Sequence, residues 1–283
     1  MLCKAVEISK STYYRLRNKP STEDKHLKLI LNIFNESHQT YGHRRIAIAL
    51  REKYNIIINK KKVARLMKEH NIIPAYYKKK TKYKNKTSID AGKKPNLVEK
   101  HFIVTKPNQV WVTDVCTLYY KEKRRYFSVM LDLYDRKIIS YKISENNDAE
   151  LATQTLITAK WNRLDSQNVI IHSDQGSPYF SESFQLQCRL WGFQQSMSRR
   201  GRPTDNAVME SFFSRYRAEI KGFPKPKSID DVKRNAFDWV WFYDKDRISL
   251  PKKIKKRKIF NYDKAIGKAK EFEMLKMKKV KLD

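Results

Sequence analysis

Aliphatic side chains recur three and four residues apart in three short stretches between residues 22 and 75, the spacing of one face of a helix. The stretches contain Leu27, Ile30, Ile33 and Phe34; then Ile46, Ala47 and Leu50; then Val63, Leu66 and Met67. We therefore predict a small helical domain over residues 22–75. Its basic side chains fall outside these positions, as in a helix-turn-helix on a duplex, but equally as in a helical bundle with a solvated basic face.

From residue 98 onward the pattern changes to short apolar runs separated by helical segments. Strands are predicted at Val110–Leu118, Tyr126–Leu133, Lys137–Ile143, Val169–Ile171 and Phe193–Met197. Helices are predicted at Ala149–Trp161, Ser181–Leu190 and Asp205–Ile220, the last with Asp205 as its N-cap. Three strands followed by alternating helices and strands are the order of a ribonuclease-H-like fold. We therefore assign an α/β core with a mixed five-stranded sheet to residues 98–222.

Three further segments flank these two domains. Residues 1–20 have the pattern of a partial helix-turn-helix, with Ser11 and Thr12 as candidate helix caps. Residues 76–97 alternate Lys with Tyr and are predicted to be a basic linker, which could follow a nucleic-acid backbone or act as a passive tether. Residues 223–283 are predicted to contain one helix and a basic tail. The expected apolar stripe of that helix is Phe237, Val240, Trp241 and Tyr243.

The chain has a large excess of positive charge, with 61 Lys and Arg against 30 Asp and Glu, and a formal net charge of +31. Such a surface favours contact with polyanions, above all DNA or RNA. The three cysteines are far apart and form no Cys-x-x-Cys pair, which argues against a zinc site or a disulfide framework. No apolar run approaches the ~18 residues of a membrane helix, so we expect a soluble cytoplasmic protein without a membrane partner.

Three acidic residues stand in distinctive contexts: Asp114 within a strand, Asp174 directly after a strand, and Glu210 within a helix. Residues 175–209, 35 in all, separate the last two. We expect the three carboxylates to converge at the edge of the sheet. Oxygen ligands suit Mg²⁺ or Mn²⁺, and two such ions ~3.5–4 Å apart stabilise both oxygens of an in-line phosphoryl displacement. The sequence thus predicts a two-metal site.

Other polar residues near these positions are better explained by structure. Asp132 and Asp135 flank a turn and are expected to hydrogen-bond its backbone. His172 is expected to be a buried or hydrogen-bonded structural histidine, with an auxiliary contact in the active site as the alternative.

Basic residues in two regions are candidates for DNA contacts. They are Arg44, Arg45 and Arg65 in the helical domain, Arg199, Arg200 and Arg202 in the loop before the Glu210 helix, and Arg217 within that helix. The loop is punctuated by Gly and Pro, as expected of a flexible flap over a phosphate backbone. Arg217 follows Glu210 by seven residues and so lies on roughly the same helix face, although a solvated arginine is the alternative.

Five motifs resemble those of one protein family. Three carry the acids: Gln109-Val-Trp-Val-Thr-Asp114, His172-Ser-Asp174-Gln-Gly-Ser and Asp205-Asn-Ala-Val-Met-Glu210-Ser-Phe-Phe. Two lie upstream: Tyr41-Gly-His-Arg-Arg-Ile46 and Val63-Ala-Arg-Leu-Met67. Their order and spacing are similar to those of the OrfB-type transposases of the IS-three family of bacterial insertion sequences, which share the retroviral-integrase catalytic core.

The resemblance implies a ribonuclease-H-like core behind a DNA-binding helical region, and metal-dependent DNA cleavage and strand transfer at element ends. It implies Asp114, Asp174 and Glu210 as metal ligands, and DNA contacts by their helix neighbours Asn206 and Arg217, the latter usually Lys in the family. The implied partners are double-stranded DNA at element ends and target sites, and further copies of the chain. An upstream-frame helix-turn-helix protein is a further implied partner or fusion, with this chain beginning where the second frame would begin. The implied location is the bacterial nucleoid.

Two departures from the family pattern keep other functions open. Ile248 stands where the family has His, and after Leu250 the similarity gives way to a Lys-rich tail. The first rival is therefore a catalytically impaired or truncated copy that binds element ends and regulates transposition. The second rival is a related nuclease or integrase with another substrate.

Overall fold

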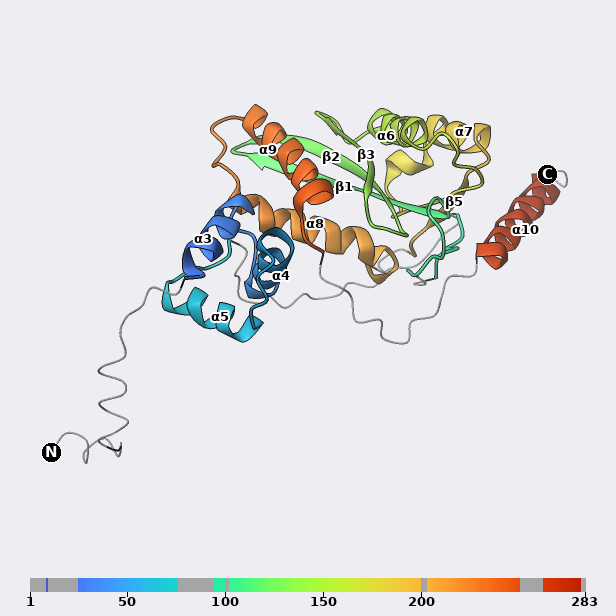
Figure 1. Cartoon of the computed structure of the whole chain (residues 1–283). Helices are drawn as coiled ribbons and strands as arrows, with labels where there is room; N and C mark the ends of the chain where they lie inside the picture. The colour runs from blue at the N-terminus through green and yellow to red at the C-terminus, as the bar shows by residue number, and fades with distance from the viewer. Residues whose placement is uncertain are drawn as a thin grey trace. The chain divides into compact units, whose positions relative to one another are not determined.

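The computed structural model describes residues 9, 25–75, 94–99, 102–199, 203–249 and 262–280. The chain forms two compact units, residues 1–74 and 75–283, and each has its own hydrophobic core (Figure 1). Apart from Ser9, the predicted partial helix-turn-helix at residues 1–20 lies outside the described residues. So do residues 76–93 of the predicted linker.

Three helices make up the described part of the N-terminal unit: α3 (Leu27–Glu36), α4 (His43–Tyr54) and α5 (Lys60–Glu69). Their buried side chains are Ile30, Ile33 and Phe34; Ile46, Ala49 and Leu50; and Val63, Leu66 and Met67. The predicted helical spacing is confirmed in all three, with Ala49 buried more deeply than the expected Ala47.

The second unit is built on a mixed five-stranded sheet in the order β3-β2-β1-β4-β5. The strands are β1 (Val110–Tyr120), β2 (Lys123–Asp132), β3 (Ile138–Ser144), β4 (Ile170–Ser173) and β5 (Gln194–Met197). The first three form an antiparallel meander, while β4 pairs in parallel with both β1 and β5. The predicted mixed sheet is confirmed, and the strand ends differ from the predicted ones by a few residues.

Helices cover both faces of this sheet (Figure 1). On one face, α6 (Ala149–Asn162) and α7 (Glu182–Leu190) pack over a core that includes Trp111 and Phe184. On the other face, α8 (Ala207–Glu219) contacts β1. Because side chains alternate along a strand, β1 serves both layers at once.

Aromatic side chains join α8 to α9 (Ile229–Trp241), which continues into a π-helical turn at Phe242–Asp246. The Trp239 ring meets two rings of α8 edge-on, with centroids 5.3 Å from Phe212 and 5.0 Å from Tyr216. Edge-to-face pairs of this kind contribute beyond the area that they bury. This aromatic cluster therefore fastens α8 along its buried side.

The predicted apolar stripe of α9 is wrong in two positions. Phe237 and Trp241 are 47% and 61% exposed, whereas Trp239 is fully buried. Val240 is buried as predicted. The helical period alone did not show which face of the helix would meet α8.

Two segments outside the predicted core pack onto it. Residues 94–97, at the end of the predicted linker, include the buried Leu97, and the Pro95 carbonyl accepts a hydrogen bond from Met197 N–H of β5. Within the predicted basic tail lies α10 (Tyr262–Val280), whose Tyr262 Oη donates to the Asn168 carbonyl.

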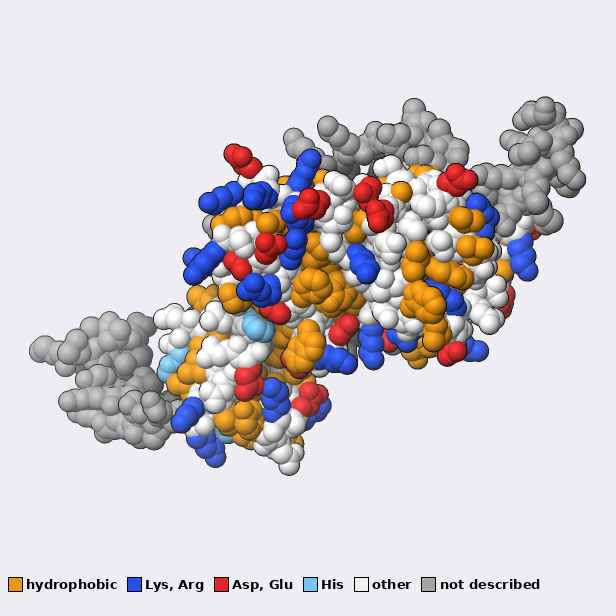
Figure 2. All heavy atoms as spheres, turned by 90° about the horizontal axis from the view of Figure 1, so that it is seen from above, with side chains coloured by type: hydrophobic (Ala, Val, Ile, Leu, Met, Phe, Trp, Pro, Cys, Tyr) orange, Lys and Arg blue, Asp and Glu red, His pale blue; other side chains and the backbone are white. Residues whose placement is uncertain are grey.

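Positive charge is spread over the surface of the described residues. Figure 2 shows Lys and Arg side chains interspersed with Asp and Glu and with exposed hydrophobic side chains on the face in view. Among the described helices, none is both long and apolar enough to cross a membrane.

Candidate active site

The parallel pairing of β1 with β4 brings Asp114 and Asp174 together. Val112 of β1 pairs with His172 of β4, so each acidic residue lies two positions further along its own strand. Asp114 is still within β1, whereas Asp174 directly follows Ser173, the last residue of β4. The two acids therefore lie side by side at the carboxyl end of β4, where open α/β sheets bind their ligands.

Glu210 is contributed by the first turn of α8. Its side chain is exposed, whereas Phe212 and Phe213 of the same helix are buried. The Phe213 ring lies 6.0 Å from the ring of Phe127 on β2, which packs α8 against the sheet. The helix is thus held by its aromatic side and leaves the carboxyl group of Glu210 accessible.

The three carboxyl groups share one electrostatic environment. Burial, and then the negative charge of Asp174, raise the pKa of Asp114 to about 7, with a smaller contribution of the same sign from Glu210. The hydrogen bond from Val115 N–H and the positive charge of Arg217 act in the opposite direction. Burial also raises the pKa of Glu210. A buried carboxyl group whose ionisation is opposed by neighbouring carboxylates, as at Asp114, favours a positive counter-charge.

A tight turn fixes the carboxylate of Asp174. Its Oδ1 accepts a hydrogen bond of 2.8 Å from Gly176 N–H. A Cβ atom at position 176 would lie 2.9 Å from that oxygen, which is closer than such contacts allow. The Asp174-Gln-Gly sequence therefore needs glycine to orient the carboxylate.

The donor chemistry suits Mg²⁺ or Mn²⁺, although the described residues form no preassembled group of three or more metal-binding side chains. Mg²⁺ is commonly held by one or two carboxylates together with water and substrate phosphates. Asp114 and Asp174 are adjacent, and Glu210 is near enough to affect the ionisation of Asp114. These residues fit a divalent metal whose ligand shell is completed by the substrate.

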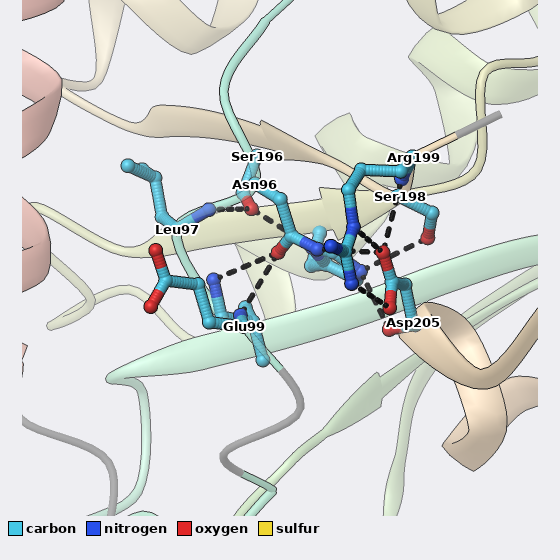
Figure 3. A network of polar contacts seen from close by, with 9 residues as sticks. Asn96, Leu97, Glu99, Ser196, Ser198, Arg199 and Asp205 are labelled. Atoms are coloured by element: carbon cyan, nitrogen blue, oxygen red, sulfur yellow. Dashed lines mark hydrogen bonds and ion pairs between the residues drawn. The ribbon is translucent and has the colours of Figure 1, made fainter. Parts of the chain in front are cut away.

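A polar network beside the acidic residues centres on Asp205 (Figure 3). Its carboxylate accepts hydrogen bonds from Arg199 Nε at 2.8 Å, Arg199 Nη2 at 3.1 Å and Asn96 Nδ2 at 2.9 Å. The prediction that Asp205 caps α8 is wrong, because Asn206 holds the N-cap position and Asp205 belongs to the 3₁₀ turn Pro203–Asn206. The Asp205 carboxylate is instead taken up by Arg199, six residues earlier, and by Asn96, 109 residues earlier.

His172 links this network to β4. Its Nδ1 lies 2.8 Å from Ser196 Oγ and its Nε2 3.0 Å from the Asp205 carbonyl oxygen. Because Ser196 Oγ already accepts from Leu97 N–H, its hydroxyl is free to donate to Nδ1, and Nε2–H then donates to Asp205. Burial lowers the pKa of His172 to about 4, consistent with this neutral form. The predicted structural role of this histidine is confirmed.

The two acidic residues expected in a turn also have the predicted contacts. Asp132 accepts hydrogen bonds of 2.9 Å from Tyr134 N–H and from Asn108 N–H. Asp135 accepts one of 3.0 Å from Lys137 N–H. The carboxylates of both residues therefore serve to bind backbone N–H groups of the neighbouring loops.

Comparison with known proteins decides the family. Residues 104–203 and 191–248 match the family described as Integrase core domain, and residues 21–80 match the HTH-like domain. The transposase for insertion sequence element IS904 of Lactococcus lactis subsp. lactis (strain IL1403) is 35% identical over 214 residues, 75% of this chain and 83% of that protein. The transposase InsF for insertion sequence IS3A of Escherichia coli (strain K12) is 31% identical over 228 residues, 77% of each chain. This chain belongs to the IS3-type transposases.

Two further comparisons complete the picture. The InsK protein of insertion sequence element IS150 of Escherichia coli (strain K12) is 32% identical over 252 residues, 88% of each chain. Among solved structures, a chain of the simian T-cell lymphotropic virus intasome in complex with PP2A regulatory subunit B56 gamma matches at 14% identity with a TM-score of 0.42. That match covers 78% of this chain and 70% of the other. At such values the structural likeness has no bearing on function.

In this IS3-type transposase, Arg217 lies close to the acidic residues. Its Nη1 is 3.2 Å from Cys116 Sγ, and Cys116 is two positions after Asp114 on the same side of β1. Its charge also lowers the pKa of Asp114. The side chain is exposed. Arg217 is therefore placed where a bound phosphate could reach it.

Asn206, unlike the exposed Arg217, is buried. Its Nδ2 donates to the Thr113 carbonyl at 3.3 Å, and the residue is only 5% exposed. Thr113 directly precedes Asp114, so Asn206 ties the start of α8 to β1. A DNA contact by Asn206 stays a prediction that this burial does not favour.

The other predicted DNA contacts differ in accessibility. Arg44 and Arg65 are exposed, the latter with Glu69 at 3.6 Å, and Arg45 lies over the ring of Tyr41 at 5.6 Å. Arg199 is engaged with Asp205 through two side-chain hydrogen bonds. Arg200 and Arg202 lie outside the described residues.

Tyr179, which the structure places beside the acidic residues, was missed in the sequence analysis. The residue is 2% exposed and its hydroxyl lies 3.4 Å from Thr113 Oγ1. Burial, and then the negative charge of Asp114, raise its pKa well above the usual value. Two features of the sequence could have pointed to it: Tyr179 follows Asp174 by five residues, and Ser177-Pro178 directly before it favours a short turn that returns the chain toward the site.

Proposed function

We propose that this chain cleaves DNA strands at the ends of an insertion sequence and joins them to target DNA by metal-dependent phosphoryl transfer. The proposal is supported by the parallel pairing that puts Asp114 and Asp174 on neighbouring strands of an integrase-type core, and by the charges of Asp174 and Glu210, which both raise the pKa of Asp114. The proposal includes the use of these three residues as the catalytic set and of two divalent ions as cofactors.

Both proposed steps exchange one oxygen on phosphorus for another. In cleavage, a water oxygen attacks the phosphorus and loses its proton, while the bond to the 3′ oxygen breaks and that oxygen gains a proton. In joining, the new 3′-hydroxyl attacks a phosphorus of the target strand and expels the 3′ oxygen of that strand. The number of phosphodiester bonds is unchanged in the second step, so no external energy source is needed.

The residues of the site would position the substrate and control charge. Asp114 and Asp174 would hold the metal ions, with Glu210 as the third ligand group. When bound, the metal ions would supply charge neutralisation and lower the pKa of the attacking oxygen. The same carboxylates without cations would repel a phosphate backbone, so the site itself makes DNA processing depend on metal.

DNA binding is proposed for both units. The net charge of +31 and the HTH-like match support contact with a duplex, and Arg44, Arg65 and Arg217 are exposed basic side chains suited to phosphates. We also propose that copies of the chain assemble so that two element ends are processed together. An upstream-frame helix-turn-helix partner or fusion remains part of this proposal.

The test is a cleavage and joining assay on a labelled duplex that carries the DNA flanking the coding sequence. We expect nicking at the element end with Mg²⁺ or Mn²⁺ and none with EDTA. Asp174→Asn should abolish nicking, because a metal ligand is lost, and should leave duplex affinity unchanged or higher. Asp165→Asn, at an exposed position in the same unit, is the matched control and should cleave normally.

Two outcomes would overturn parts of the proposal. Nicking retained by Asp174→Asn would remove Asp174 from the catalytic set. Duplex binding without nicking by the unmodified chain would instead favour the regulator, for which Ile248 in place of the family histidine is the specific observation.

Salt dependence tests the proposed mode of binding. If about six phosphates are contacted, duplex affinity should fall about a thousandfold between roughly 50 and 200 mM salt, because bound counterions are released. Fluorescence anisotropy with a labelled duplex measures this slope. An affinity that hardly changes with salt would contradict phosphate-dominated binding.

A further inference from the structure

The short turn Pro203–Asn206 is the point where the elements of the active site meet. Asp205 contacts β4 through its carbonyl oxygen, which lies 3.0 Å from His172 Nε2. Asn206 contacts β1 through its side chain, which donates to the Thr113 carbonyl. Glu210 follows one helical turn later. A displacement of this turn would therefore move Glu210 relative to both Asp114 and Asp174.

The start of α8 has little local support of its own. Its N-cap residue, Asn206, makes no side-chain hydrogen bond to the first turn of the helix. Helix N-termini usually gain such a cap from Ser, Thr, Asp or Asn. The position of this helix end is thus set by the contacts that precede it, and above all by those of Asp205.

The Asp205 carboxylate is held from two directions (Figure 3). Arg199 binds both of its oxygens and also donates its backbone N–H to Oδ2 at 3.2 Å. Asn96 donates to Oδ2 from the segment that enters the core. Asp205 is 0% exposed, and a buried carboxylate is tolerated only when it is paired and hydrogen-bonded. Arg199 therefore supplies the charge that allows Asp205 to stay buried.

We propose that the Arg199–Asp205 ion pair is a positioning element, which sets the start of α8 so that Glu210 is correctly placed against Asp114 and Asp174. Arg199 then acts through Asp205 and not by contact with DNA. The inference rests on the proposed function, because the placed group is one of the proposed metal ligands. If the two residues act as a unit, loss of either one should have the same effect as loss of both.

The experiment compares Arg199→Gln, Asp205→Asn and the double variant, all in the full chain. Mn²⁺ binding to the DNA-free protein is measured by electron paramagnetic resonance, and duplex affinity by fluorescence anisotropy at fixed salt. We expect each single variant to bind Mn²⁺ about tenfold more weakly, as is typical when a residue that supports metal ligands is removed. The double variant should be no worse than either single one. The duplex affinity of Arg199→Gln should stay within about twofold of the value for Arg189→Gln, which removes an equal charge from an exposed site on α7.

Amide hydrogen exchange supplies a readout that needs no metal. Both single variants should exchange faster than wild type at the first amides of α8 that have intrahelical acceptors, from Glu210 onward, and at the wild-type rate at its C-terminal end. Arg199→Lys keeps the positive charge, and so serves as a variant that is expected to fold even if Arg199→Gln does not. Its amide exchange rates at the start of α8 should lie between those of wild type and Arg199→Gln. If wild type binds no Mn²⁺, the proposed metal chemistry fails and exchange alone still decides this inference.

Two results would overturn the positioning role. One is a loss of duplex affinity in Arg199→Gln that clearly exceeds the loss in Arg189→Gln, which would make Arg199 a DNA contact. The other is unchanged exchange at the start of α8 in both variants.

Discussion

The two ends of α8 are held by different kinds of interaction. At its N-terminal end the contacts are directional hydrogen bonds around Asp205, and the main partner, Arg199, has a side chain that is 48% exposed. At its C-terminal end, rings of α8 and α9 interlock, and Glu219 forms an ion pair with Arg247 in which both side chains are 3% exposed. The helix is thus fixed at its start by polar contacts, and from Phe212 to Glu219 by aromatic packing and a buried ion pair.

The two kinds of contact have different consequences: one mainly stabilises the fold, and the other mainly sets the position of the helix end. Buried aromatic rings remove a large apolar area from water, but they tolerate small shifts. Charged hydrogen bonds at a half-exposed site contribute less to folding, yet a bidentate Arg–carboxylate pair has a strict geometry. We therefore expect substitutions at the C-terminal end to reduce the free energy of unfolding, and substitutions at the N-terminal end to reduce function first.

The largest effect is expected for Trp239→Ala, which removes the centre of the aromatic cluster. It should lower the free energy of unfolding of the core by about 4 kcal/mol, since loss of a buried Trp side chain leaves a cavity. All five tryptophans lie between Trp111 and Trp241, so the fluorescence of the remaining four reports on the second unit alone. Trp239→Phe is the control and should cost far less, because its ring keeps most contacts and the Trp239 Nε1–H has no hydrogen-bond partner in the described structure. Similar losses in both variants would contradict the role of the ring.

The next largest effect is expected for Arg247→Met. Arg247 makes three hydrogen bonds of 2.9–3.1 Å to the Glu219 carboxylate, and its removal leaves a buried charge without them. A loss of about 3 kcal/mol in the free energy of unfolding is expected, measured by denaturant titration followed by tryptophan fluorescence.

The matched variant for this pair is Arg247→Met combined with Glu219→Leu. It should recover most of the loss, because two apolar side chains can replace a buried ion pair at little cost. A double variant as unstable as the single one would show that the pair itself, and not the stranded charge, stabilises this end of the helix.

The sequence predicted the strands and the acidic residues, but not the contacts that hold either end of α8. The strands followed from their apolar runs, and the acidic residues from their positions after or within those runs. The N-cap prediction for Asp205 was wrong because its position before a helix favours a cap, while its carboxylate is bound by Arg199, on the far side of a loop, and by Asn96, 109 residues away. The face of α9 was misread for a similar reason, since Phe237 and Trp239 are equally apolar and only α8 decides which is buried. In both cases the local sequence allows more than one arrangement, and contacts with residues elsewhere in the chain determine which one forms.

The smallest effect in stability is expected for Asp205→Asn, and it should depend on pH. Burial raises the pKa of Asp205, but the hydrogen bonds and charge of Arg199, together with the hydrogen bond from Asn96, outweigh it, so the pKa lies below its usual value. The stabilisation from this carboxylate is therefore complete above the unfolded-state pKa of about 4 and is lost as pH falls through the lower folded-state pKa. Wild type should exceed Asp205→Asn by about 1 kcal/mol at neutral pH, and the gap should close below about pH 4.

The same titration at the other end of α8 sharpens the contrast. The gap between wild type and Trp239→Ala should be nearly independent of pH, because no ionisable group is removed. Urea titrations of all three proteins between neutral and acidic pH, followed by tryptophan fluorescence, measure both gaps. A gap for Asp205→Asn that widens on acidification would mean that Asp205 is held as a neutral acid. Its bonds to Arg199 could not then be an ion pair, and the polar end of α8 would be fixed by hydrogen bonds alone.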